Sequence, residues 1–429
     1  MRERKNSGIE WIGKIIKTWN ILKGKYVLNY LQRPVKISDE VVTCFRDGEV
    51  TLRSNRRTEG FTVSDKEIGY QGIEKGDLVV HGMDGFAGAI GISDSRGKGS
   101  PILNVLNSSQ NKKYLMYYLR TLAYENVFLG LSTGIRVRSC DLRWNKLANL
   151  NFVIPSKIEQ QQIVDFLDQK CSEIDSLSAD IQKQIDILEK YKKSVITEAV
   201  TKGLNPNVEM KDSGIEWIGR IPKHWGTTKI KYTSWLKGRI GWQGLKSSEY
   251  IEKGAYLITG TDFIDGKINW NSCVHISELR FNQDHSIHVK ENDLLISKDG
   301  TIGKVAIASN CPEKVSLNSG ILLIRSLNKT YTSKYLYYLL LSNVFLAWYD
   351  SNQTGNSTIK HLYQEQFYNF SFSIPKLQEQ HNITDFLDKQ CAEIDKTIKE
   401  KQKQLEILAE YKKSVIYEYV TGKKEVPAA

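Results

Sequence analysis

Two arginine-rich segments carry the side chains best suited to bind a polyanion. TLRSNRRT spans Thr51 to Thr58 with three arginines in five residues, and STGIRVRS spans Ser132 to Ser139. Guanidinium groups bind phosphates and base edges through charge-assisted hydrogen bonds, although an arginine-rich loop is about as often only a solvated surface. From these segments we predict DNA contact by Arg53, Arg56, Arg57, Thr133, Arg136 and Arg138.

A later part of the chain offers a second set of hydrogen-bonding and cationic groups. They lie in KGRIGWQGL at Lys237 to Leu245 and directly after it, in NDLLISKDGTIGKVAI at Asn292 to Ile307, and around Asn356. GTIGK lacks the length and the Ser or Thr of a phosphate-binding P-loop, so we interpret it as a tight turn. The predicted DNA-contacting residues here are Arg239, Trp242, Gln243, Lys246, Lys298, Thr301, Lys304, Asn356, Ser357 and Lys360.

Catalytic and metal-binding patterns were sought as alternatives. The chain has no Asn-Pro-Pro-Tyr or Asp-Pro-Pro-Tyr string, no Walker pair and no C-x-x-C pair among its six cysteines. His285 and His288 have no third ligand at a fitting spacing. His81 in HGMDG is interpreted as structural, with contact to a DNA base as the alternative. We therefore expect no catalytic residue, no metal site and no cofactor.

Composition favours a globular protein with a polyanionic partner. The 429 residues carry a net charge of +11, and 40% of them are apolar, enough for buried cores. At roughly 150 residues per domain the length suggests about three units. No apolar run reaches 18 residues, and the N-terminal residues MRERKNSGIE lack a hydrophobic signal core, so a cytoplasmic location is expected.

The chain contains an internal duplication. SGIEWIG at Ser7 to Gly13 returns at Ser213 to Gly219, and Ile154 to Gly203 returns as Ile374 to Lys423 with 27 of 50 positions identical. Tryptophans that recur with the short block, Trp11, Trp19, Trp217 and Trp225, are expected to anchor it against a helix. The duplicated short and long blocks therefore flank two regions that are dissimilar in sequence.

The long repeat predicts two helices with heptad seams. About 45 residues without Gly or Pro would form a helix on the order of 65 Å long, and each apolar stripe is most simply buried against its duplicate in antiparallel pairing. A core helix of an ordinary bundle is the alternative. The predicted seam residues are Ile163, Leu167, Ile174, Leu177, Ile181 and Leu188 in the first copy, and Ile383, Leu387, Ile394, Ile398, Leu405 and Leu408 in the second.

These patterns predict an α/β (α+β) chain: two mixed globular domains joined by two long antiparallel helices in a coiled coil, with internal pseudo-twofold symmetry. The expected divisions are 1–20, a short repeat docking near the second long helix; 21–153, the first variable domain; 154–211, the first long helix and a linker; 212–226, the second short repeat; 227–373, the second variable domain; and 374–429, the second long helix and a tail.

The order SGIEWIG, variable region, IP-x-x-x-EQ, FLD-x-x-x-x-EID and YKKSVI, given twice, resembles the specificity subunit of type I restriction-modification systems. Within the variable regions, GDLVVHGMDGFAGAIGIS at Gly76 to Ser93 and LNSGILLIR at Leu317 to Arg325 resemble strings of that family's target recognition domains.

The resemblance implies a non-catalytic reader of double-stranded DNA, in which each domain reads one half of a split, asymmetric target. It also implies docking of two adenine-N6 methyltransferase subunits, with nuclease/translocase subunits joining for restriction. The alternative is a non-catalytic architectural coiled-coil protein that binds DNA without sequence preference. The divergence of the two domains disfavours that alternative, because a shape reader gains nothing from it.

Overall fold

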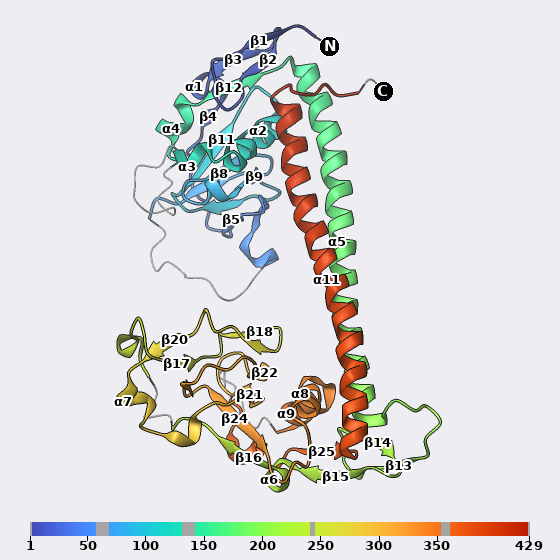
Figure 1. Cartoon of the computed structure of the whole chain (residues 1–429). Helices are drawn as coiled ribbons and strands as arrows, with labels where there is room; N and C mark the ends of the chain where they lie inside the picture. Colours follow the sequence, from blue (N-terminus) through green and yellow to red (C-terminus); the bar gives the residue numbers. More distant parts are fainter. Residues whose placement is uncertain (1, 57–67, 131–141, 241–244, 353–360, 428–429) are drawn as a thin grey trace. The chain divides into compact units, whose positions relative to one another are not determined.

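The computed structural model describes residues 2–56, 68–130, 142–240, 245–352 and 361–427. The chain divides into two compact units (Figure 1). Unit 1 holds Met1–Gln182 and Gln402–Ala429, and unit 2 holds Lys183–Lys401. The two boundaries fall inside the two long helices, so each unit contains one part of each helix.

The two long helices are α5 (Lys157–Lys202, 46 residues) and α11 (Leu377–Val420, 44 residues). In unit 1, Lys412 Nζ lies 2.7 Å from Asp175 Oδ1, and in unit 2, Lys192 Nζ lies 2.6 Å from Asp395 Oδ2. The early part of each helix thus packs against the late part of the other, which makes the pair antiparallel. The predicted mixed class with two paired long helices is confirmed.

The seam prediction is wrong at Leu177, whose side chain is 50% exposed. The seam instead passes through Ile174, Ser178, Ile181 and Ile185, which keeps the alternating steps of three and four residues. Ser178 tolerates this position because its hydroxyl donates to the Ile174 carbonyl at 2.8 Å. Counting apolar letters alone therefore chose the neighbouring leucine and missed Ile185.

The other predicted seam residues are buried to different degrees. Leu188, Leu405 and Leu408 are half-buried. The remainder are at most 8% exposed, namely Ile163, Leu167, Ile174, Ile181, Ile383, Leu387, Ile394 and Ile398.

Unit 1 is built on a four-stranded sheet of order β4-β11-β8-β9, with α2 packed on it. Smaller two-stranded pairs are β1-β2, β3-β12, β5-β6 and β7-β10. The bounds are β1 Arg4–Asn6, β2 Lys14–Ile16, β3 Asn20–Lys23, α1 Gly24–Val27, β4 Asn29–Tyr30, β5 Val42–Cys44, β6 Val50–Leu52, β7 Gln71–Ile73, β8 Leu78–His81, β9 Ile90–Ile92, β10 Gly97–Gly99, β11 Leu103–Asn107, α2 Lys112–Tyr124, α3 Val127–Gly130, α4 Trp144–Asn149 and β12 Asn151–Ile154.

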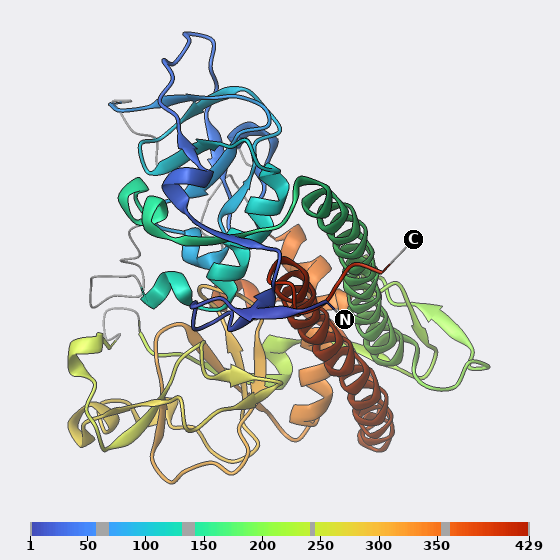
Figure 2. The same cartoon turned by 90° about the horizontal axis from the view of Figure 1, so that it is seen from above.

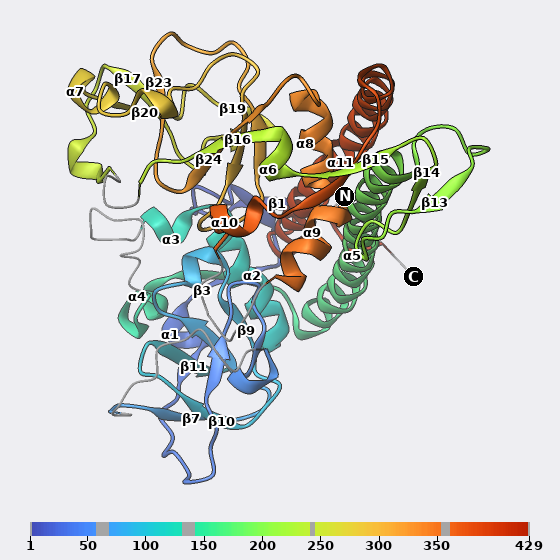
Figure 3. The same cartoon turned by 90° about the horizontal axis from the view of Figure 1, so that it is seen from below.

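Unit 2 has a six-stranded sheet of order β16-β24-β21-β22-β19-β18, and the pairs β13-β14 and β15-β25. Its three-stranded sheet is β20-β17-β23 (Figure 3). The bounds are β13 Met210–Asp212, β14 Arg220–Pro222, β15 Gly226–Lys229, α6 Ile230–Thr233, β16 Ser234–Lys237, β17 Ala255–Ile258, β18 Phe263–Ile264, β19 Lys267–Ile268, β20 Val274–Ile276, α7 Glu278–Phe281, β21 Leu294–Ser297, β22 Val305–Ile307, β23 Val315–Leu317, β24 Ile321–Ser326, α8 Ser333–Leu341, α9 Asn343–Ser351, α10 Gln364–Phe367 and β25 Ser371–Ile374.

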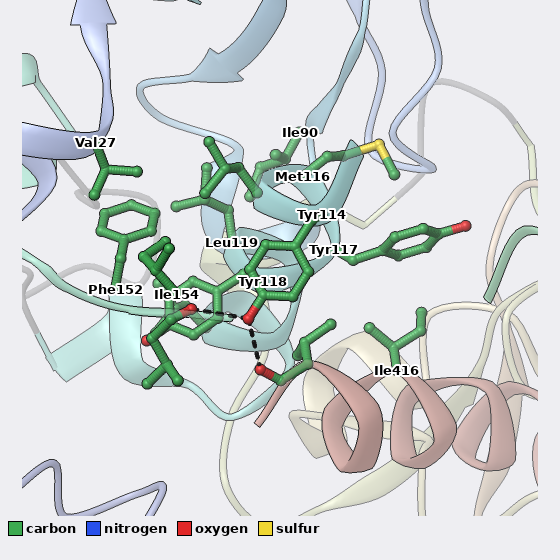
Figure 4. Packing of buried hydrophobic residues seen from close by; sticks show 14 of the residues in the cluster. Val27, Ile90, Tyr114, Met116, Tyr117, Tyr118, Leu119, Phe152, Ile154 and Ile416 are labelled. Atoms are coloured by element: carbon green, nitrogen blue, oxygen red, sulfur yellow. Dashed lines mark hydrogen bonds between the residues drawn. The ribbon is translucent and has the colours of Figure 1, made fainter. Parts of the chain in front are cut away.

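In each unit a buried tyrosine at the equivalent position contacts both a strand and a long helix. In unit 1 the Tyr114 hydroxyl lies 2.8 Å from the Val153 carbonyl and 3.0 Å from the Val420 carbonyl (Figure 4). In unit 2 the Tyr335 hydroxyl lies 2.9 Å from the Ser373 carbonyl, with a second carbonyl, that of Val200, at 3.3 Å. Because each phenol is buried, these contacts satisfy a group that would otherwise be costly to desolvate.

The short block forms a closed turn. The Ser7 amide donates to the Gly13 carbonyl at 2.8 Å, and the Ser213 amide donates to the Gly219 carbonyl at 3.0 Å. Gly13 and Gly219 have φ of 69° and 71°, a left-handed conformation that explains why glycine recurs there. In unit 1 this turn lies beside the end of α11, near both chain termini (Figure 2), and the Tyr417 hydroxyl donates to the Trp11 carbonyl at 3.0 Å.

Each globular region begins and ends on one antiparallel strand pair. Ile21 of β3 lies opposite Val153 of β12, and Thr227 of β15 lies opposite Ser373 of β25. The chain therefore enters and leaves each region at the same place, and everything between can vary while the pair stays fixed.

Candidate nucleic-acid interface

In unit 1 the candidate interface starts at the loop between β8 and β9. Gly82, the first residue of this loop, donates its amide to the Ile102 carbonyl at 2.8 Å. Its carbonyl accepts the Leu142 amide at 2.9 Å. Leu142 is the first described residue after Gly130, so this bond fixes the end of the segment that contains Thr133, Arg136 and Arg138. Those three predicted contact residues lie outside the described residues.

Unit 2 repeats this arrangement with different side chains. Lys298 follows β21, donates its amide to the Gly320 carbonyl at 2.8 Å and accepts the Leu362 amide at 3.0 Å. The segment that precedes Leu362 contains the predicted residues Asn356, Ser357 and Lys360, which also lie outside the described residues. In both units a hairpin loop and the end of a second segment are thus joined by the same backbone bond.

The hairpin loop of unit 2 is held by Ser297. Its hydroxyl donates to the Thr301 carbonyl at 2.6 Å and accepts the Lys304 amide at 3.0 Å. Gly300 and Gly303 have φ of 71° and 79°, as the tight turn expected from GTIGK requires. The three predicted residues Lys298, Thr301 and Lys304 lie on this one loop. Thr301 and Lys304 are exposed, and Lys298 is half-buried.

Two residues that the sequence prediction missed join this loop. His361 Nδ1 lies 2.7 Å from Asp299 Oδ1, which links the loop to the residue directly after Lys360. Tyr363 beside it is 59% exposed. The signal available in the sequence was only that His361 directly follows the predicted Lys360.

The arginine-rich segment of unit 1 is partly engaged within the protein. Arg56 Nη1 lies 2.6 Å from Asp47 Oδ2 and 3.2 Å from Glu49 Oε2, and its guanidinium stacks on Phe45 at 4.2 Å. The Arg53 Nε donates to the Thr43 hydroxyl at 3.3 Å. Both arginines therefore have defined orientations, while Arg57 lies outside the described residues.

A cavity of about 460 Å³ lies beside Arg56. Arg46 Nη2 lies 2.8 Å from Asp84 Oδ1 at its edge. His81 also lines the cavity. Burial is the main cause that lowers the pKa of His81; nearby Arg46 lowers it further, and Asp84 partly opposes both effects. The lining residues are Thr43, Cys44, Phe45, Arg46, Asp47, Arg56, His81 and Asp84.

The structure contradicts the prediction for Arg239, which is 1% exposed. Its Nε donates to the Leu317 carbonyl at 2.8 Å and its Nη2 to the Ser316 hydroxyl at 3.0 Å. Glycine-flanked arginines suggest an accessible loop, but this side chain turns inward to satisfy the β23 backbone. Lys246 is exposed, and Trp242 and Gln243 lie outside the described residues.

Lys304 provides a direct test of the unit 2 loop. Lys304→Ala should weaken binding to every DNA sequence and reduce the slope of log affinity against log salt by about one, because it removes one phosphate contact. The measurement is fluorescence anisotropy with the full chain at several salt concentrations. Lys396→Ala, which removes an exposed lysine from α11, is the matched control and should leave the slope unchanged. Equal slopes for all three proteins would remove Lys304 from the interface.

Comparison with known proteins finds one matching family model and several similar sequences. Residues 243–406 match the model of the type I restriction modification DNA specificity domain. A putative type I restriction enzyme MjaX specificity subunit from Methanocaldococcus jannaschii is 27% identical over 85% of this chain and 77% of its own. The type I restriction enzyme MjaVIII specificity subunit of the same organism is 23% identical over 96% and 94%.

One solved structure supports the fold. A chain from a study of complex assembly and conformational transition of the type I R-M system has a TM-score of 0.69 at 14% identity and covers 96% of this chain and 99% of its own. The solved chain shares the mixed α/β fold with two long helices. Together the matched family model and the two relatives indicate similarity to the specificity subunits of type I restriction-modification systems.

In the described part of the chain, no helix has both the length and the apolar character that crossing a membrane requires. No group of three or more His, Cys, Asp or Glu side chains is arranged there to hold a metal ion.

Proposed function

We propose that this chain reads a bipartite, asymmetric DNA target, with one half-site read by each unit. The observation that carries this proposal is the repeated backbone bond from Gly82 to Leu142 and from Lys298 to Leu362. The bond holds equivalent loops in the same place, while the side chains on those loops differ. A duplicated frame with different reading surfaces is suited to two different half-sites.

The long helices set the spacing between the half-sites in this proposal. Two surfaces read from one face of B-DNA need a separation near one helical turn, roughly 34 Å, or a multiple of it. α5 and α11 are each about 65 Å long at 1.5 Å per residue, which is long enough to provide such a spacer. In this proposal the protein catalyses no reaction itself, and it places its catalytic partner subunits at the DNA target.

The same helices offer a surface for two adenine-N6 methyltransferase subunits. Ile187 and Tyr191 on α5 are 63% and 53% exposed, and their repeat equivalents Ile407 and Tyr411 on α11 are 58% and 53% exposed. Residues four apart lie on one helix face, so each pair forms an exposed apolar patch, and the patch occurs once in each unit. Nuclease/translocase subunits join this assembly for restriction.

Native mass spectrometry tests the assembly. At saturation we expect one copy of this chain with two methyltransferase subunits. Tyr191→Asp and Tyr411→Asp should each lose one bound methyltransferase subunit, because binding would have to desolvate the new charge in the patch. Leu177→Asp is the matched control, since Leu177 is also half-exposed on α5 but its repeat equivalent is Thr397. A one-to-one complex of the native chain at saturating partner contradicts the proposal.

A further inference from the structure

His81 occupies the same place in unit 1 that Ser297 occupies in unit 2. His81 ends β8 opposite Leu103, and Ser297 ends β21 opposite Ile321. Both side chains hold the hairpin loop that follows. His81 Nδ1 accepts the Met83 amide at 3.2 Å and the Asp84 amide at 2.9 Å. Loop support therefore accounts for Nδ1 of the histidine, as it accounts for the hydroxyl of the serine.

The second ring nitrogen of His81 has no such role. Nε2 lies 4.0 Å from Asp84 Oδ2, too far for a hydrogen bond, and that carboxylate is already engaged by Arg46. The side chain is 19% exposed and lines the cavity of about 460 Å³ next to Arg56. A serine in this position would hold the loop without presenting any group to the cavity.

The loop contacts also fix which nitrogen carries the proton. A nitrogen that accepts two backbone N–H bonds cannot itself be protonated, so the hydrogen of the neutral ring resides on Nε2. Burial lowers the pKa of His81, which keeps the ring neutral. His81 Nε2 is consequently a donor, and it cannot accept.

We propose that His81 is a specificity-determining residue of unit 1, whose Nε2–H donates to an acceptor on the major-groove edge of one DNA base. Guanine and adenine offer N7, guanine also offers O6, and thymine offers O4, whereas cytosine presents an amino donor. The position that His81 reads therefore excludes cytosine. This inference rests on the proposed function, because it requires unit 1 to read a half-site.

The test uses two substitutions that keep an acceptor for the loop at the place of Nδ1 and, because both side chains are shorter than histidine, remove the donor at the place of Nε2. In His81→Asn the side-chain oxygen can accept the Met83 amide as in an Asx turn. His81→Ser places the unit 2 residue at the equivalent position. The full chain with its methyltransferase subunits first gives the methylated motif, and binding is then measured on duplexes that vary each position of the motif through all four bases.

At one position of the unit 1 half-site, the native chain should bind the duplex that carries cytosine about tenfold more weakly than duplexes with the other bases. Both variants should lose most of this difference in affinity. Thermal unfolding of the variants should match that of the native chain. Unchanged base profiles for a folded variant overturn the role of His81, as does a change confined to the unit 2 half-site. If the native chain gives no bipartite motif, the proposed function itself fails, whatever the variants do.

Discussion

Leu167→Asp is expected to destabilise unit 1 by roughly 4 kcal/mol or more, because it removes a buried leucine and places a carboxylate where water is excluded. Leu167, on α5, is fully buried in the hydrophobic core of unit 1, which also contains residues of α11. Urea unfolding followed by circular dichroism should show a much lower midpoint. Leu387, the repeat equivalent, is also fully buried, and Leu387→Asp should have a similar effect on unit 2.

Leu177→Asp is the control that separates this structure from the simple heptad pattern. The pattern places Leu177 in the seam, but its side chain is half-exposed, so the substitution should change stability by about 0.5 kcal/mol or less. Comparable losses for Leu167→Asp and Leu177→Asp would mean that the seam follows the apolar letters and not the packing described above.

Exchange of residues 227–373 for the equivalent region of a homologous specificity subunit should change one half of the methylated motif and leave the other half unaltered. The two ends of this segment, Thr227 and Ser373, are cross-strand partners on β15 and β25, so the exchange keeps both strands in register. The loop that carries Lys298 to Lys304 travels with the segment, whereas the His81 loop does not. Altered bases in both half-sites would defeat the assignment of one reader to each unit.

The helices could be predicted from sequence because their signal is long and repeated. A stretch of some 45 residues without Gly or Pro, given twice, leaves little choice of secondary structure. The exact seam was less predictable, because a small polar residue such as Ser178 can occupy it once its hydroxyl has a local acceptor. The spacing of apolar residues does not reveal that a serine hydroxyl has such an acceptor.

The loops that carry the candidate residues could be located from sequence, but the placement of each side chain could not. Lys304 and Lys246 are exposed, whereas Arg239, chosen on the same grounds, is buried. The difference lies in long-range partners, here the Leu317 carbonyl and Ser316, which sequence spacing does not reveal. For the same reason the sequence favoured a structural role for His81: its loop contact is local, while the cavity that it lines is formed largely by residues 43–47 and Arg56, far away in the chain.

Long-read methylation sequencing of cells that carry this chain with its methyltransferase subunits tests the central claim most directly. The native chain should give methylated adenines in a motif of two different specified half-sites separated by a fixed number of unspecified bases. The chain with residues 227–373 exchanged should keep one half-site and the spacer and change the other half-site. A single continuous motif, or methylation without sequence preference, would contradict the two-reader account.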